Sequence, residues 1–329
     1  MSKLNSSKTL VTGAGGFIGS HLVERLVRDG VAVRAFVHYN SRNDWGLLEF
    51  LPREALSEVE VISGNIEDSH SVSEAMKGCR TVYHLSSLIA IPYSYVAPQS
   101  YVTTNVVGAV NVMQAALAEG VERVVHTSTS ECYGTARYVP IDEKHPLQGQ
   151  SPYSASKIGA DMIAESYWRS FGLPVVTIRP FNTYGPRQSA RAVIPTIISQ
   201  ALAGAEVRLG SLTPTRDLNY VEDTVDGFVR IAHADVVGEV VNVGSAREIG
   251  IGELARLILR LMGSDSRIVC DEDRVRPQMS EVERLLCNND KAQRLLGWQP
   301  RVPLEEGLRR TIEWVTSHRT RYKPQLYNL

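Results

Sequence analysis

Short apolar runs alternate with amphipathic segments along the first 180 residues of this 329-residue chain. Each apolar run is bounded by glycine or polar residues, as buried parallel strands are. The predicted strands are 9–11, 31–37, 59–66, 81–87, 121–127 and 175–178. Helical patterns separate them at 20–30, at about 101–119 and after Pro152. This alternation predicts an α/β fold with a doubly wound parallel sheet of the Rossmann type.

The regular alternation ends at about residue 180. Helical patterns dominate beyond it, at 192–203, 251–262, 288–297 and 304–317, with strand-like runs at 206–210 and 240–244. We therefore predict an NAD(P)-binding Rossmann domain formed by residues 1–180, with returning segments at about 217–246. Residues 181–216 and 247–329 are predicted to form a smaller, mostly helical substrate-binding domain.

Composition narrows the functional classes. The formal net charge of −1 offers no bulk attraction to nucleic acid or to an anionic membrane. The four cysteines are scattered without metal-binding spacing, which predicts reduced thiols, no metal site and a cytoplasmic protein. The segment Met1–Lys8 is polar and leads directly into a strand, so no signal peptide is expected. No apolar run approaches the roughly 18 residues that cross a bilayer.

Three glycines follow the first predicted strand and open into a helical pattern. Gly13 suits a tight turn, Gly16 a close approach of backbone to a pyrophosphate, and Gly19 close packing of helix on strand. Phe17 and Ile18 lie in this loop just before the helical pattern, at a helix N-terminus where an anion can bind, and are predicted to contact the cofactor. The loop therefore predicts a dinucleotide cofactor, NAD(P)+, although its G-x-x-G-x-x-G spacing is not the commonest one.

The second predicted strand ends at Val37, where an acid would hold the adenosine ribose 2′-hydroxyl. Without that carboxylate, Ser41 and Arg42 could hold a 2′-phosphate, which slightly favours NADP over NAD. The alternative, that Arg42 is a solvated loop residue, stays open. Further cofactor contacts are predicted near the ends of strands two to four, at Tyr39, Asn40, Asn65, Ile66, Leu85, Ser86 and Ser87.

Two stretches carry candidate chemistry. Tyr153 and Lys157 are four residues apart, so on a helix they lie on one face. An ammonium beside a phenol is expected to lower the pKa of the phenol, and a phenolate can take a proton from a sugar hydroxyl. Thr129, Ser130 and Glu131 follow the fifth strand, and ligands of such sheets bind beyond the carboxyl ends of the strands. The alternatives are a turn or helix cap for the hydroxyls and a surface charge for Glu131.

Four motifs together resemble the extended short-chain dehydrogenase/reductase family of NAD(P)-dependent nucleotide-sugar epimerases and dehydratases. They are Gly13/Gly16/Gly19, Tyr153-x-x-x-Lys157, Arg179-Pro-Phe-Asn182-x-Tyr-Gly-Pro186 and Arg216-Asp-x-x-Tyr-Val-x-Asp223. The run 140–153 further resembles bacterial N-acetylhexosamine 4,6-dehydratases of nonulosonic-acid pathways, such as that of legionaminic acid. Asn65 replaces a usual Asp, Ser86 and Ser87 replace small apolar residues, and Cys132 replaces a β-branched residue.

This resemblance implies conversion of an NDP-hexose, UDP- or GDP-N-acetylglucosamine, to its 4-keto-6-deoxy sugar. Tyr153 would deprotonate the 4-hydroxyl while hydride leaves C4, and Lys157 would keep the phenolate accessible. Glu131 would remove the C5 proton, and water would leave from C6 with Glu131, Ser130 or an ordered water relaying the proton. Thr129 would hydrogen-bond O4 as its charge changes.

The resemblance also implies where the substrate binds and how the chain assembles. Asn182, Arg187, Arg216 and Arg276 are candidates to bind the substrate phosphates, and the family pattern favours Asn182, Arg216 and Arg276. Tyr93 is predicted to line the sugar pocket, with core packing as the alternative. A homodimer is expected through the helices holding residues 101–118 and 153–170. The alternatives are a UDP-glucuronate decarboxylase, a nucleotide-sugar 4-epimerase and a non-catalytic NADP-binding regulator. The Thr-Ser-Glu run does not exclude a decarboxylase, whereas an epimerase has no need of a C5 base.

Overall fold

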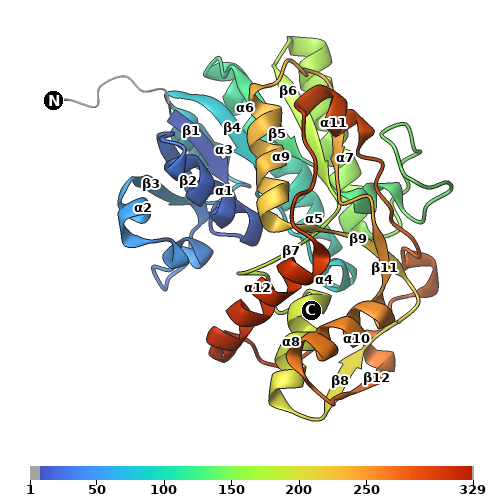
Figure 1. Ribbon diagram of the computed structural model, residues 1–329. Coiled ribbons are helices and arrows are strands. Elements are labelled where there is room, and N and C mark those ends of the chain that lie inside the picture. Colours follow the sequence, from blue (N-terminus) through green and yellow to red (C-terminus); the bar gives the residue numbers. More distant parts are fainter. Residues whose placement is uncertain (1–7, 328–329) are drawn as a thin grey trace.

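The computed structural model describes residues 8–327 (Figure 1). Within that range, seven parallel strands form one sheet in the order β10-β6-β5-β4-β1-β2-β3. The strands are β1 (Lys8–Thr12), β2 (Val33–His38), β3 (Val59–Gly64), β4 (Cys79–His84), β5 (Arg123–Thr127), β6 (Val175–Pro180) and β10 (Val240–Val243). The predicted doubly wound parallel sheet is therefore confirmed, including the late strand near residue 240. The absence of a signal peptide was predicted from residues that lie almost entirely outside the described range.

Helices cover both faces of this sheet. On one face lie α1 (Phe17–Arg28), α9 (Val221–His233) and α11 (Asp290–Leu296). On the other lie α3 (Ser69–Met76), α6 (Gly108–Ala118) and α7 (Pro152–Phe171). Neighbouring strand residues point to opposite faces, so Leu10 packs in one apolar core and Val11 in the other. The five inner strands β1, β2, β4, β5 and β6 are largely buried on both faces, which explains their apolar runs, whereas the edge strand β3 exposes Glu60 and Ser63.

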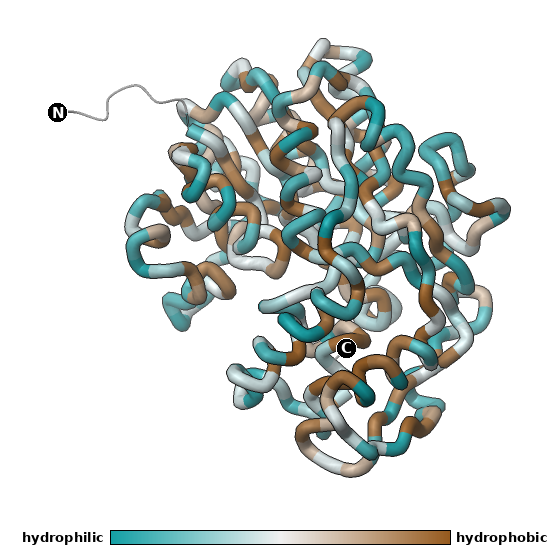
Figure 2. The backbone as a smooth tube through the Cα atoms, in the orientation of Figure 1, coloured by the Kyte–Doolittle hydropathy of each residue, from teal (hydrophilic) through white to brown (hydrophobic). Residues whose placement is uncertain are grey.

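The remaining elements form a smaller region below the sheet in Figure 1. Its helices are α8 (Val193–Ala203), α10 (Ile251–Met262) and α12 (Leu304–Ser317). One small sheet holds β7 (Asn182–Tyr184), β9 (Thr215–Tyr220) and β11 (Glu248–Gly250), and another holds β8 (Glu206–Leu209) and β12 (Arg267–Cys270). Figure 2 shows hydrophobic stretches in the interior of both regions and hydrophilic ones along the outer loops.

The segment after residue 217 divides between the two regions. Helix α9 and strand β10 return to the large sheet, whereas β9 pairs with β7 and β11 in the small sheet. Strand β9 has the polar sequence TRDLNY, yet five of its six residues are buried. A search of the sequence for apolar runs therefore does not find this strand. The division of the chain into two domains at residue 180 stays a prediction. In the described part of the chain, no helix combines the length and apolar character needed to cross a membrane.

Candidate active site at the carboxyl edge of the sheet

The glycine-rich loop packs tightly against the exit of β4. Gly13 has φ +69°, and a Cβ built on it would lie 2.8 Å from the backbone N of Ser86. A Cβ on Gly19 would collide with the carbonyl oxygen of Gly13. A Cβ on Gly16 would meet only that same oxygen, at 3.1 Å. Gly16 therefore leaves room on its outer side, where the first N–H groups of α1, from Phe17 onward, can receive a phosphate.

The exit of β4 is fixed by a buried hydroxyl. Oγ1 of Thr12 accepts hydrogen bonds from the backbone N of Leu85 at 3.1 Å and of Ser86 at 3.2 Å. The same oxygen lies 2.9 Å from Nδ1 of His84. Ser86 and the next residue, Ser87, are half-buried beside the glycine loop. Because these side chains are small, they leave room beside the glycine loop for a pyrophosphate.

The loop after β2 is organised by Asn40. Its side-chain oxygen accepts from the backbone N of Arg42 at 3.0 Å and of Asp44 at 3.3 Å, and its Nδ2 donates to the carbonyl of Asp44 at 2.7 Å. The Arg42 side chain is 79% exposed and lies 3.7 Å from the Asp44 carboxylate. Tyr39 and Ser41 are exposed beside it. A carboxylate in this loop opposes a 2′-phosphate, so the structure gives no support to the predicted tilt toward NADP.

The end of β3 is fixed in a similar way. The Asn65 side-chain oxygen accepts from the backbone N of Glu67 at 3.1 Å, which makes a turn just beyond the strand. Ile66 is buried, and its carbonyl accepts from Nδ2 of Asn111 at 3.0 Å. Since β1, β2, β3 and β4 are parallel neighbours, the loops that follow them meet at one edge. The residues at this edge therefore fit a dinucleotide.

Tyr153 and Lys157 lie on the buried face of α7. The helix begins at Pro152, and Oγ of Ser151 caps it by accepting from the backbone N of Ser154 at 3.1 Å. Tyr153 is 7% and Lys157 4% exposed. Nζ of Lys157 donates to the carbonyl of Thr127 at 2.6 Å, which places the ammonium under the end of β5.

The electrostatics of this pair differ from the prediction. Burial raises the pKa of Tyr153, the Glu131 carboxylate adds to the rise, and a hydrogen bond with the Thr129 hydroxyl opposes it. Burial also lowers the pKa of Lys157, and the Asp161 carboxylate opposes that change. The prediction that Lys157 lowers the pKa of Tyr153 is therefore wrong for this structure, because the ammonium is engaged by Thr127 and burial dominates the phenol.

The Thr-Ser-Glu run folds back over Tyr153. Thr129 caps the short 3₁₀ helix Ser130–Tyr133, accepting from the backbone N of Glu131 at 3.3 Å. Ser130 is 2% and Glu131 8% exposed. The Thr129 hydroxyl hydrogen-bonds the Tyr153 hydroxyl, and the Glu131 carboxylate lies near enough to raise the pKa of this phenol. A hydroxyl, a carboxylate and a phenol thus converge at the carboxyl edge, so Glu131 is no surface charge.

A row of tyrosines leads from this point towards solvent. The ring of Tyr101 lies 6.2 Å from that of Tyr153 and 6.2 Å from that of Tyr93, measured between centroids. Tyr93 lies on α4 (Ile91–Val96) and is 38% exposed. Nearby, the Tyr95 hydroxyl oxygen lies 2.6 Å from Oγ of Ser280, which links α4 to the C-terminal region.

Two of the predicted phosphate-binding arginines meet at a single carboxylate. Nη2 of Arg216 donates to Oε1 of Glu281 at 2.9 Å, and Nη1 of Arg276 approaches the same oxygen at 3.4 Å. Nη1 of Arg216 also donates to the carbonyl of Val282 at 2.6 Å. The side-chain oxygen of Asn182 is buried and, among the described residues, lacks a hydrogen-bond partner. These residues could bind the substrate.

Arg187 does not join this group. Its Nη2 donates to Glu24 on α1 at 2.6 Å, and its guanidinium lies 6.0 Å from the centroid of the Trp314 ring on α12. It is 8% exposed and held between these two helices. Its Nε and Nη1 are buried and have no hydrogen-bond partner among the described residues, so its predicted role in substrate binding stays a prediction.

Sequence reasoning missed two residues of the arginine cluster. Glu281 accepts from both arginines, and the Tyr327 ring lies 4.8 Å from the guanidinium carbon of Arg274. Burial raises the pKa of Tyr327, and the positive charges of Arg276 and Arg274 oppose this rise, whereas the Tyr95 hydroxyl adds to it. The C-terminal segment therefore borders the same cluster. The arginine-rich run 274–276 was the available signal, but it does not reveal which distant residues share the charge.

A Rossmann-type sheet with a buried Tyr-Lys pair and a carboxylate at its carboxyl edge defines the extended short-chain dehydrogenase/reductases that act on nucleotide sugars. The chain matches the family described as GDP-mannose 4,6 dehydratase over residues 10–311. It is 35% identical over 315 residues to the UDP-glucose 4-epimerase of Mycolicibacterium smegmatis, covering 93% of this chain and 98% of that protein. It is 33% identical over 320 residues to a dTDP-glucose 4,6-dehydratase of Streptomyces antibioticus, covering 96% of this chain and 94% of that protein.

A solved structure agrees with these relatives. The dTDP-glucose 4,6-dehydratase DesIV of Streptomyces venezuelae, solved with NAD bound, superposes with a TM-score of 0.85 at 29% identity over 96% of this chain and 99% of its own. The chain therefore belongs to the extended nucleotide-sugar epimerase/dehydratase family. It is an NAD-dependent nucleotide-sugar 4,6-dehydratase or 4-epimerase.

Proposed function

We propose that this protein is a 4,6-dehydratase that converts an NDP-hexose, UDP- or GDP-N-acetylglucosamine, to its 4-keto-6-deoxy derivative. The observation that carries the proposal is the Glu131 carboxylate, which is buried and influences the Tyr153 phenol. Dehydration needs a base for the C5 proton, whereas inversion at C4 does not. The N-acetylhexosamine is supported by the resemblance of the run 140–153 to dehydratases that use such sugars.

We propose NAD as the cofactor, held by the glycine loop, the turns after β2 and β3, the exit of β4, and Tyr153 and Lys157. The packing of Gly13 and Gly19 and the open side of Gly16 support this fit, and Asp44 argues against a 2′-phosphate. When bound, NAD supplies a hydride acceptor that is regenerated within one catalytic cycle. Lys157 is placed to hold a ribose hydroxyl while it stays anchored to Thr127.

Each side chain around Tyr153 then has its own part in the proton transfers of the reaction. Tyr153 must act as the phenolate, a form that the positive charge of bound NAD would favour against the effect of burial. The phenolate takes the proton of the 4-hydroxyl, and Thr129 donates a hydrogen bond to O4 as negative charge develops there. The resulting C4 ketone acidifies the C5 proton, which Glu131 removes as general base. Ser130, which is buried beside Glu131, relays a proton to the departing 6-hydroxyl. Burial of this group excludes bulk water from the sugar carbons.

Glu131→Gln separates a dehydratase from the alternatives. With UDP- and GDP-N-acetylglucosamine as probes, the wild type should give a product with a new methyl signal in NMR. In Glu131→Gln, C4 oxidation should survive as NADH absorbance, while water loss falls by about 10²–10⁴-fold. Glu143→Gln, the same change at a half-buried carboxylate that accepts from the backbone N of Asn242, is the control. Inversion at C4 in the wild type would indicate an epimerase, and loss of C6 from UDP-glucuronate a decarboxylase.

We also propose a homodimer through the helical face of residues 101–118 and α7. Four large apolar side chains on these helical segments are exposed: Val102 by 53%, Val107 by 42%, Met162 by 46% and Phe171 by 57%. Exposed large apolar groups, where they form a patch, are typical of a contact surface. Light scattering should give the mass of a dimer for the wild type and a smaller mass for Met162→Glu. A monomeric wild type would rule the dimer out.

A further inference from the structure

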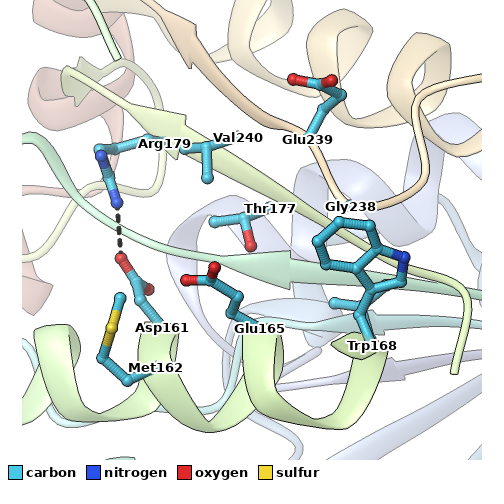
Figure 3. A pocket seen from close by; sticks show the side chains of 10 residues that line it. Asp161, Met162, Glu165, Trp168, Thr177, Arg179, Gly238, Glu239 and Val240 are labelled. Atoms are coloured by element: carbon cyan, nitrogen blue, oxygen red, sulfur yellow. Dashed lines mark hydrogen bonds and ion pairs between the residues drawn. The ribbon is translucent and has the colours of Figure 1, made fainter. Parts of the chain in front are cut away.

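A buried ion pair lies behind the proposed acid/base groups and takes no part in their chemistry. Arg179 on β6 and Asp161 on α7 are 3% and 4% exposed, and Nη2 of the arginine lies 2.7 Å from Oδ2 of the aspartate. Figure 3 shows the two side chains reaching toward each other across the wall of a small pocket between α7 and β6. A buried pair is seldom a gain in stability over apolar residues of the same volume. Its contacts therefore call for another explanation.

Asp161 holds the end of β5 from both sides of Thr127. Its Oδ1 lies 3.0 Å from Nε2 of His126, and its Oδ2 accepts from Oγ of Ser128 at 2.5 Å. The carbonyl of the intervening Thr127 accepts from Lys157. Asp161 and Lys157 are one helical turn apart on α7. Together they attach three consecutive residues of β5 and its exit to this helix.

Arg179 holds both ends of the Thr-Ser-Glu run. Its Nε donates to Oγ of Ser128 at 3.0 Å, and its Nη1 donates to the hydroxyl of Tyr133 at 2.8 Å. The guanidinium also lies 4.7 Å from the centroid of the Tyr133 ring. Ser128 and Tyr133 stand on either side of residues 129–132, which include Glu131. The planar fork of one guanidinium thus fixes the start and the end of that segment.

We propose that the Arg179–Asp161 pair positions the segment 128–133, and that this clamp holds Glu131 in register with Tyr153. The inference rests on the function proposed above and adds two positioning residues to it. Since the fork binds three partners in one plane, a lysine at residue 179 keeps the charge but loses the geometry. An apolar pair keeps the fold without fixing the carboxylate.

The test removes the clamp at its two outer ends. The double variant Ser128→Ala/Tyr133→Phe leaves Arg179 and Asp161 paired and loses both bonds from the arginine to the segment, together with the bonds from Ser128 to Asp161 and from Tyr133 to Asn242. Because buried groups lose partners, Tm should fall, so kinetics are measured well below it. We expect kcat to fall by about 10²-fold, as misplacement near 1 Å does, with NAD affinity and KM close to wild type. Deuterium uptake at C5 from D2O should fall with kcat, whereas NADH formation should not. The control is Ser166→Ala/Tyr138→Phe, which removes one exposed serine and one exposed tyrosine hydroxyl.

A second variant guards against a fold defect. Arg179→Lys should show the same selective loss: kcat and deuterium uptake at C5 should fall together, while NADH formation, KM and NAD affinity stay close to wild type. If the double variant matches its control in kcat, or if kcat falls only in parallel with NAD affinity, the clamp is overturned. Failure of the dehydratase proposal would appear separately, in the wild type, as a product without a new methyl group. The clamp would then be judged from the ratio of variant to wild-type kcat for the product that does form.

Discussion

The two ends of the proposed substrate site are built in different ways. At the catalytic end, Thr129, Glu131, Tyr153 and Lys157 come from one strand exit and one helix, and buried hydrogen bonds fix them. At the arginine end, Arg216 comes from β9 and Arg276 from a loop, and both depend on Glu281. Arg216 is 9% and Arg276 27% exposed at the side chain. The first end is part of the folded scaffold, whereas the second is assembled from segments far apart in the sequence.

This contrast separates chemistry from recognition. A phenol and a carboxylate in fixed register suit steps shared by every substrate of such an enzyme. Two guanidinium groups that share one carboxylate retain free donors for a diphosphate. We therefore expect changes at the catalytic end to lower kcat and changes at the arginine end to alter KM.

The largest effect is expected for Tyr153→Phe. Loss of the hydroxyl removes the group proposed to take the 4-hydroxyl proton, so kcat should fall by about 10²–10⁴-fold. KM and NAD affinity should change little, because the ring still packs against Tyr101. Steady-state kinetics and NAD titration measure both. Tyr101→Phe, which loses only a bond to the carbonyl of Ala90, is the matched control. A large rise in KM with unchanged kcat would show that Tyr153 binds the substrate rather than taking part in the chemical step.

Arg216→Gln tests the opposite end. Charged hydrogen bonds of about 1.5–3 kcal/mol should be lost with the diphosphate, so KM should rise by roughly 10- to 100-fold. The kcat should stay within a few-fold of wild type, since Arg216 is held on β9 away from the exit of β5. Arg208→Gln on β8, an arginine paired with Glu206, is the control. Titration with UDP and GDP checks binding without turnover, and unchanged affinity for both would remove Arg216 from the site.

The same contrast explains what the sequence could reveal. The large sheet was predictable because most of its strands are buried on both faces and are therefore rich in apolar residues. The glycine loop and the Tyr-Lys spacing are local patterns, so they predicted the catalytic end. Strand β9 is polar in sequence and buried only through tertiary hydrogen bonds such as those of Asp217 with Ser245. No local pattern marks it as a strand.

Long-range pairing sets the remaining limit. The motif around Arg187 suggested a phosphate ligand, but its partner Glu24 lies 163 residues away. Glu281 is likewise 65 residues from Arg216. In the sequence, Val37 and Arg42 favour NADP. In the structure, Asp44 lies two residues after Arg42, its carboxylate faces the guanidinium, and this negative charge opposes a 2′-phosphate. Such pairings depend on the tertiary fold, which the sequence pattern does not specify residue by residue.

The pH dependence of stability tests a contact between helix α1 of the large sheet and the segment that follows β7. His21 on α1 lies 3.0 Å from the carbonyl of Pro186, after β7. Burial lowers its pKa from 6.5 to about 4, and the charge of Arg187 adds to this. Between these values the unfolded chain binds a proton that the folded chain does not, so stability should rise with pH there and be lost on acidification. The full shift corresponds to at most about 3 kcal/mol.

His21→Gln should therefore flatten the pH dependence of Tm between about pH 6.5 and 4 while keeping a donor near Pro186. His70→Gln, at an exposed histidine on α3, is the control. Thermal unfolding at several pH values measures the slope. An identical slope in His21→Gln and wild type would show that other groups, such as the buried His84 and His126, carry the effect.

The smallest effect, and the sharpest test of the arginine end, is expected for Glu281→Gln. The carboxylate organises Arg216 and Arg276 but also competes with the substrate diphosphate for their charge. An amide oxygen can still accept from Arg216, whereas its neutral charge no longer offsets the guanidinium groups. Removal of one negative charge near the diphosphate should therefore strengthen binding, and KM should fall a few-fold with kcat unchanged. Glu283→Gln, two residues along the same segment, is the control. A rise in KM instead would mean that the carboxylate serves mainly to order the arginines, and the arginine end would then resemble the fixed catalytic end.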